Sequence, residues 1–204
     1  PNGSDPLFTN TYNAARIHYA MMAETMTHLY ANVPYFDANR GTEGSAYFLP
    51  RYDSQQDIYT RQGIGENEVR GGILWELDDA AAGLATPGID PLGSSDLIYG
   101  GDLAKWRKFA YSLMLRFAMR IAEADPATAS TYIAKAIAGG MMTSNDDIAW
   151  VPMATGPSEW LNQNGISRGM RPGSGGEGHG WIRPSAALID FLKDNNDPRL
   201  MIHS

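Results

Sequence analysis

Residues 96–122, with the sequence DLIYGGDLAKWRKFAYSLMLRFAMRIA, indicate a helix that is too apolar to be buried on one side only. Asp102 is placed to cap it, and apolar residues follow at steps of three and four, the spacing of one helical face. That face consists of Leu103, Trp106, Ala110, Leu113, Phe117 and Ile121. Phe109, Met114 and Met119 widen the apolar surface further. We therefore expect neighbouring structure to contact this helix on two sides.

Further helices are expected on either side of this segment. The apolar spacing predicts helices over residues 13–32, over about 67–84 and over 126–138, and a last short helix capped by Ser185. No segment alternates apolar and polar residues over the length of a strand. The sequence thus predicts an all-α fold of helix pairs with long irregular loops. The element sizes resemble tetratricopeptide-like repeats of about 34 residues, although no clean internal repeat is present.

The composition excludes several classes of function. The chain of 204 residues has 43% apolar and 19% charged residues, which is typical of one globular domain or a large part of one. A net charge of −7 without basic runs argues against nucleic-acid binding. The absence of cysteine excludes disulfides, thiolate metal sites and a cysteine nucleophile. No apolar segment reaches the roughly 20 residues of a membrane-spanning helix.

Two short patterns match catalytic motifs by their letters. Residues 165–169 (GISRG) fit G-x-S-x-G, with Ser167 at the nucleophile position, and residues 173–178 (GSGGEG) fit G-x-G-x-x-G. Both motifs require a strand before the turn and a helix after it, and neither context is present in the flanking sequence. We therefore interpret both segments as loops and predict that the protein is not an enzyme. A hydrolase that uses Ser167 is the rival interpretation.

Two groups of polar side chains are candidates for metal sites. Glu24 and His28 lie four residues apart and could share a helix face, but a hydrogen bond is expected there rather than a metal. The carboxylates of Asp146 and Asp147 are expected to be solvated, with calcium as the alternative. No metal or cofactor is therefore predicted. The methionine-rich face of the first helix, Met21, Met22 and Met26, is expected to fill the core.

The segment from Met141 to Arg183 carries the best candidate for a binding site. It is rich in glycine and proline and contains three tryptophans and several amides. Sugar recognition needs flat apolar faces for the pyranose ring, with amide and guanidinium groups near the hydroxyls. The residues predicted to contact the ligand are Trp160, Trp181, Asn162, Gln163 and Arg168. The alternative is that tryptophans such as Trp150 only pin the loop to the helices.

Several segments together resemble one protein family. Residues 96–122 are similar to the signature region of the SusD/RagB family of outer-membrane nutrient-binding lipoproteins, D-x-I/L-Y-G-G-D-x-x-K-W-x-K-F-A-x-S-L-x-L-R-x-A-M-R. Other similar segments follow the family's order: ANVPYFDA (31–38), PRYDSQQDIY (50–59), ILWELDDAAAGL (73–84) and NNDPRL (195–200). The insertion TRQGIGENEVRGG (60–72) departs from the family pattern.

The resemblance implies a SusD-like all-α fold, of which residues 1–204 are an internal portion of one domain, without its N- and C-terminal parts. It implies a lipid anchor outside this chain, on the outer membrane and facing the cell exterior, with no other membrane contact. The function implied is to capture oligosaccharides and deliver them to a SusC-like TonB-dependent transporter. A peptide-binding member of the family and a helical-repeat scaffold for protein partners are the alternatives.

Overall fold

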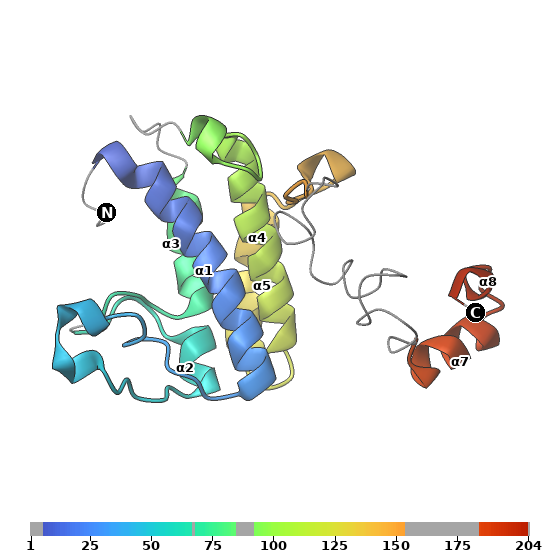
Figure 1. The fold of residues 1–204 in the computed structure, drawn as a ribbon, viewed down its shortest axis with the longest axis horizontal. Coiled ribbons are helices and arrows are strands. Elements are labelled where there is room, and N and C mark those ends of the chain that lie inside the picture. The colour runs from blue at the N-terminus through green and yellow to red at the C-terminus, as the bar shows by residue number, and fades with distance from the viewer. Residues whose placement is uncertain (1–5, 67, 85–91, 154–183, 204) are drawn as a thin grey trace, which may run out of the picture. The chain divides into compact units, whose positions relative to one another are not determined.

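The computed structural model describes residues 6–66, 68–84, 92–153 and 184–203, and it is helical throughout these ranges apart from loops (Figure 1). The first of two compact units ends at Trp150. Its helices are α1 (Thr9–Tyr30), α2 (Gln55–Thr60), α3 (Ile73–Gly83), α4 (Leu103–Arg120) and α5 (Pro126–Gly139). Single 3-10 turns are η1 (Pro6–Phe8), η2 (Gly41–Glu43), η3 (Ser45–Tyr47), η4 (Gly93–Ser95) and η5 (Asn145–Asp147).

The second unit comprises residues 151–204 and carries α7 (Ala186–Asp194) and α8 (Leu200–His203). Within the described ranges, β-structure is confined to an isolated bridge between Val33 and Asp53, so the all-α prediction is confirmed. Over the same ranges, no helix combines the length and the apolarity that crossing a bilayer requires.

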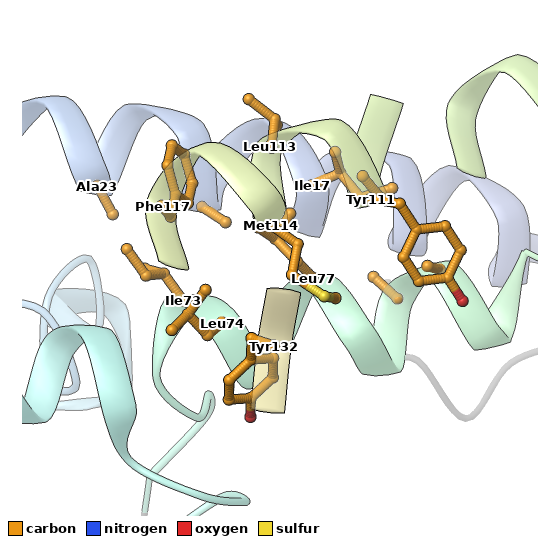
Figure 2. Close-up of a cluster of buried hydrophobic side chains, with 14 of the residues drawn as sticks. Ile17, Ala23, Ile73, Leu74, Leu77, Tyr111, Leu113, Met114, Phe117 and Tyr132 are labelled. Carbon is orange, nitrogen blue, oxygen red and sulfur yellow. The ribbon is translucent and has the colours of Figure 1, made fainter. Parts of the chain in front are cut away.

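The core of the first unit lies between α1, α3, α4 and α5. Helix α4 packs against both α3 and α5, and α1 packs mainly against α3 (Figure 1). Figure 2 shows that their side chains meet in one cluster, which includes Ile17, Leu77, Met114, Phe117 and Tyr132. These five residues are at most 2% exposed. The prediction that neighbours contact the helix of residues 103–121 on two sides is therefore confirmed.

Helix α1 buries a different face from the one that its large apolar residues indicate. Its buried apolar residues are Ala14, Ile17, Ala20 and Ala23. Met22 and Met26, by contrast, are 56% and 48% exposed, and only Met21 packs partly against the core. The prediction that the methionine-rich face fills the core is wrong for Met22 and Met26. Because alanine side chains are short, they allow the backbones of α1 and α3 to approach closely, and the long methionines point away.

Helix α3 begins at Ile73, six residues later than the sequence predicts. The segment before it is not helical: Gly72 has an extended backbone and donates its N–H to the carbonyl oxygen of Arg61 at 3.0 Å. A side chain on Gly72 would place its Cβ 2.7 Å from the backbone nitrogen of Arg61, so this approach requires glycine. Glu68 forms ion pairs with Arg51 and Arg61 instead of continuing a helix.

Helix caps are present at Asp102 and Ser185, where the sequence predicts them, and also at Ser54 and Asp125. The side chains of Ser54, Asp102, Asp125 and Ser185 each accept a hydrogen bond from the backbone N–H three residues ahead. Pro126 occupies the first turn of α5, where its missing N–H costs nothing. These caps fix where α2, α4, α5 and α7 begin.

Asp96 organises the turn that leads into α4. Its carboxylate accepts hydrogen bonds from the backbone N–H groups of Ile98, Tyr99 and Gly101 and from Nε1 of Trp106, the last at 2.7 Å. Gly101 has φ +92°, and a Cβ there would lie 2.8 Å from the backbone nitrogen of Gly93. The aspartate, the glycine and the tryptophan of the signature region are therefore parts of one folded turn.

The environment of Asp96 lowers the pKa of its carboxyl group. Partial burial on its own would raise this pKa, but the hydrogen bonds from Trp106 and from the backbone N–H groups stabilise the charged form and outweigh it. The charged carboxylate therefore stabilises the folded state above the pKa that Asp96 has when unfolded. That contribution is lost as the pH falls through the lower pKa of the folded state.

Asp53 connects two of the segments that resemble the family. Its Oδ2 accepts hydrogen bonds from the backbone N–H groups of Tyr35 and Phe36, both at 2.9 Å, and its Oδ1 accepts one from Nε of Arg51. Asp53 is only 5% exposed. This carboxylate fixes the segment after α1 against the segment before α2, so ANVPYFDA and PRYDSQQDIY form one structural unit.

We predict that Asp96→Asn lowers the free energy of unfolding at pH 7 by about 1–3 kcal/mol, because the amide nitrogen cannot accept the hydrogen bonds that a carboxylate oxygen accepts. Urea unfolding measured against pH checks this, and the difference from the wild type should shrink below about pH 4. Asp146→Asn, which removes the same charge from an exposed side chain, is the matched control. Equal losses in the two variants would contradict the role of the turn.

Candidate functional site

The residues predicted to contact the ligand lie outside the described residues. This holds for Trp160, Trp181, Asn162, Gln163 and Arg168, and for the glycine-rich patterns at 165–169 and 173–178. These assignments stay predictions. What the structure does describe is the start of the same segment, up to Met153, in which Trp150 is 62% exposed.

The start of this segment is fastened to α4 through Asp147, which is only 4% exposed. Its Oδ1 accepts a hydrogen bond from Nζ of Lys108 at 2.8 Å, and its Oδ2 accepts one from the backbone N–H of Thr143 at 3.1 Å. Its backbone oxygen accepts a hydrogen bond from the hydroxyl of Tyr99 at 2.9 Å. The expectation that Asp147 is solvated, with calcium as the alternative, is therefore wrong, because its charge is buried and neutralised by Lys108.

The hydrogen bonds to Asp147 also change the pKa of its carboxyl group. The hydrogen bond from Lys108, supported by the one from the N–H of Thr143, lowers the pKa of the Asp147 carboxyl below its ordinary value. A second contact also holds the start of this segment on α4: the hydroxyl oxygen of Ser112 accepts a hydrogen bond from the backbone N–H of Met142 at 2.9 Å. The chain therefore leaves the helical core, three residues before Trp150, from a fixed position.

A buried carboxylate joins the C-terminal half of α1 to the end of α4. Glu24 is 2% exposed, and its Oε1 forms an ion pair with Nε of Arg120 at 2.8 Å and accepts a hydrogen bond from the hydroxyl of Tyr59 at 3.3 Å. Arg116 lies 3.7 Å from the other carboxylate oxygen. Burial and the charge of Glu24 raise the pKa of Tyr59 to about 12, so this hydroxyl remains a donor at neutral pH.

His28 takes part in the same network. Nη1 of Arg120 lies 2.9 Å from Nδ1 of the imidazole, so one guanidinium contacts both Glu24 and His28. The expected hydrogen bonding of these two residues is thus made through Arg120 rather than directly. Across the described ranges, no group of three or more histidine, aspartate or glutamate side chains is arranged to hold a metal ion.

A cavity of about 390 Å³ opens beside this network, and we call it the polar pocket. It lies where α1 ends, along α2, and at the turn between α4 and α5. Its lining consists of His28, Gln55, Gln56, Tyr59, Thr60, Arg120, Ile121, Ala124 and Asp125. The sequence analysis did not identify this pocket, because its residues come from segments that lie far apart in the chain.

A second cavity of about 630 Å³ follows the exposed face of α1, and we call it the methionine groove. Met22 and Met26 line it together with Tyr30 and Tyr52, which are 66% and 74% exposed. Its other lining residues are Tyr19, Ala23, Asn32, Val33, Pro34, Tyr35, Ala38 and Asn39. The apolar stripe that the sequence shows on α1 is therefore the wall of a surface groove.

We predict that Glu24→Gln lowers the free energy of unfolding by about 1–3 kcal/mol, because it leaves the charge of Arg120 without its partner. The loss is smaller than for a fully buried pair, since Arg120 is partly exposed to water. The double variant with Arg120→Gln should lose less than the sum of the two single variants. Glu123→Gln, at an exposed position, is the control. Strict additivity in urea unfolding would contradict this coupling.

Comparison with known proteins identifies the family. A family model described as "Starch-binding associating with outer membrane" matches residues 3–204. A solved structure of a chitin-binding protein is 34% identical over 98% of this chain, with a TM-score of 0.73. A chitin-binding SusD homologue from Flavobacterium johnsoniae is 27% identical over 94% of the chain, with a TM-score of 0.68. No curated protein matches the chain.

A SusD homologue from Bacteroides uniformis is 28% identical over 92% of the chain, with a TM-score of 0.67. The chain spans only 38%, 35% and 35% of the lengths of these three structures, in the order given. The fold predicted from the resemblance is confirmed, since the helices described above superimpose on structures of helical, tetratricopeptide-like proteins. Because the family model matches nearly every residue and the agreement extends to solved structures, the protein belongs to the SusD-like family.

Proposed function

We propose that the protein binds oligosaccharides at the outer face of the outer membrane and passes them to a SusC-like TonB-dependent transporter. The observation that carries this proposal is the relative described as a chitin-binding protein, which is 34% identical over 98% of the chain. A second chitin-binding homologue and the starch-binding description of the family model point to the same class of ligand. A lipid anchor in a longer polypeptide would hold the protein at the membrane.

We place the glycan contacts on the segment that follows Trp150. Trp160 and Trp181 would stack on the apolar faces of sugar rings, while the amides of Asn162 and Gln163 and the guanidinium of Arg168 would bind hydroxyl or acetamido groups. The fastening of Asp147 to Lys108 and Tyr99 supports this placement, because a binding loop gains affinity when the scaffold fixes its point of departure.

The protein is proposed to bind and release its ligand without chemistry. Three buried carboxylates among the described residues support this: Glu24 pairs with Arg120, Glu76 with Arg16 and Asp147 with Lys108. A carboxylate whose oxygens are occupied by an arginine or a lysine is poorly placed to reach a substrate as a general acid. These three pairs connect helices or anchor a loop, which are structural tasks.

We predict that Trp160→Ala and Trp181→Ala each weaken glycan binding by at least fivefold, since an aromatic contact contributes about 1 kcal/mol or more. Calorimetry with chitohexaose and maltoheptaose measures the affinity, and Trp160→Phe, which keeps a ring, should retain most of it. Unchanged affinity in both alanine variants would overturn the proposed site. Stronger binding of a mixed peptide library than of either glycan would favour the peptide-binding alternative.

The hydrolase alternative makes a different prediction. Ser167→Ala should leave glycan affinity unchanged, and the wild-type protein should release no shorter sugars from chitohexaose over a day of incubation. Chromatography of the incubation mixture detects such products. Hydrolysis that disappears in Ser167→Ala would show that the protein is an enzyme.

A further inference from the structure

We propose that the polar pocket is a second saccharide site, which holds one or two uncharged sugar units of a glycan. This inference rests on the proposed function for the class of ligand, but it concerns residues that are separate from the segment after Trp150. A volume of about 390 Å³ is in the range of small-molecule sites and suits a mono- or disaccharide.

The walls of the polar pocket are held in place by contacts that lie behind them. Tyr59 donates a hydrogen bond to the buried carboxylate of Glu24 and Arg120 forms an ion pair with it, so neither wall depends on a ligand for its position. Asp125 caps α5 by accepting the backbone N–H of Thr128 at 3.0 Å. A site with fixed walls loses little conformational entropy on binding, which raises its affinity for a small ligand.

The polar groups in the lining supply both donors and acceptors. Gln55 donates a hydrogen bond through Nε2 to the backbone oxygen of Thr27 at 2.7 Å, which orients its amide and leaves the carbonyl oxygen as an acceptor. Thr60 donates its hydroxyl proton to the backbone oxygen of Gln56 at 2.8 Å, and its lone pairs can accept. Sugar hydroxyls donate and accept at once, so they require this mixture.

The charges around the polar pocket balance. Arg116 and Arg120 contribute two positive charges, and Glu24 and Asp125 contribute two negative charges, with Glu24 paired to both arginines. A phosphate or a carboxylate would therefore meet no net positive charge to replace its hydration. This balance favours an uncharged, hydroxyl-rich ligand over an acidic one.

Part of the lining is apolar. Ile121 and Ala124 line it from the turn between α4 and α5, and Tyr59 lines it from α2. A pyranose ring presents C–H groups on its faces and hydroxyls around its edge. The combination of a small apolar surface with amides, a guanidinium and a carboxylate matches both parts of such a ring.

The test is a titration followed by nuclear magnetic resonance on the chain labelled with nitrogen-15. The probes are N,N′-diacetylchitobiose and maltose, with glucose 6-phosphate as the charged comparison. Side-chain amide signals of Gln55 and Gln56 report on the polar pocket, while indole N–H signals of Trp160 and Trp181 report on the proposed site in the loop. The two sets of signals are independent, so the experiment shows for each site separately whether a sugar binds there.

We expect at least one neutral disaccharide to shift the signals of Gln55 and Gln56, and glucose 6-phosphate to bind them at least fivefold more weakly. Ala124→Trp, which fills the polar pocket, should weaken this binding at least tenfold, whereas Glu123→Trp, one residue away and outside the lining, should change it less than twofold. Gln56→Ala, at an exposed position, should weaken it at least threefold without altering the circular dichroism spectrum.

The proposal is overturned if no neutral sugar shifts the glutamine signals, if glucose 6-phosphate binds as well as the disaccharides, or if Ala124→Trp and Glu123→Trp behave alike. Shifts at Gln55 and Gln56 without any at Trp160 and Trp181 would support the polar pocket while refuting the site in the loop. The reverse pattern would support only the function proposed above.

Discussion

The carboxylate of Asp96 is the contact on which the arrangement of α4 depends. It gathers three backbone N–H groups and the indole of Trp106, and so it ties the turn before α4 to the first turns of the helix. In the helix that follows this turn, Met114 and Phe117 enter the core between α3 and α5 (Figure 2), and Lys108 reaches Asp147. Because α4 contacts α1, α3 and α5, a change in the conformation of this turn would disturb the packing of all three helices.

Buried acidic side chains perform similar tasks elsewhere in the first unit. Asp53 holds the segments before and after it in one arrangement, and Glu76 joins α3 to α1 through Arg16. Glu24 joins α1 to α4 through Arg120. Each of these carboxylates connects parts of the chain that are distant in sequence. The apolar core brings the helices together, and the ion pairs determine which arrangement of helices is adopted, because a buried charge without its partner is strongly unfavourable.

Much of the fold follows from local sequence, and the parts that do not have clear physical causes. The caps at Asp102, Asp125 and Ser185 were predictable because capping depends on one side chain and its nearest backbone groups. The start of α3 was not, since Gly72 is held by Arg61 across a loop. The buried face of α1 was not predictable either, because periodicity locates a stripe without revealing what covers it, and alanines occupy the core instead. The residues of the polar pocket meet only after folding, and the predicted ligand residues from Trp160 to Trp181 lie outside the described ranges.

The attachment of Asp147 to Lys108 and Tyr99 has a consequence for how such a protein can diversify. Both partners belong to the signature region, so the tryptophan-bearing segment departs from an attachment point on the same turn and helix that supply much of the core. Substitutions, insertions or deletions beyond Trp150 would leave that attachment point intact. Under the proposed function, a lineage could therefore change its ligand through substitutions in this segment while the helices stay the same.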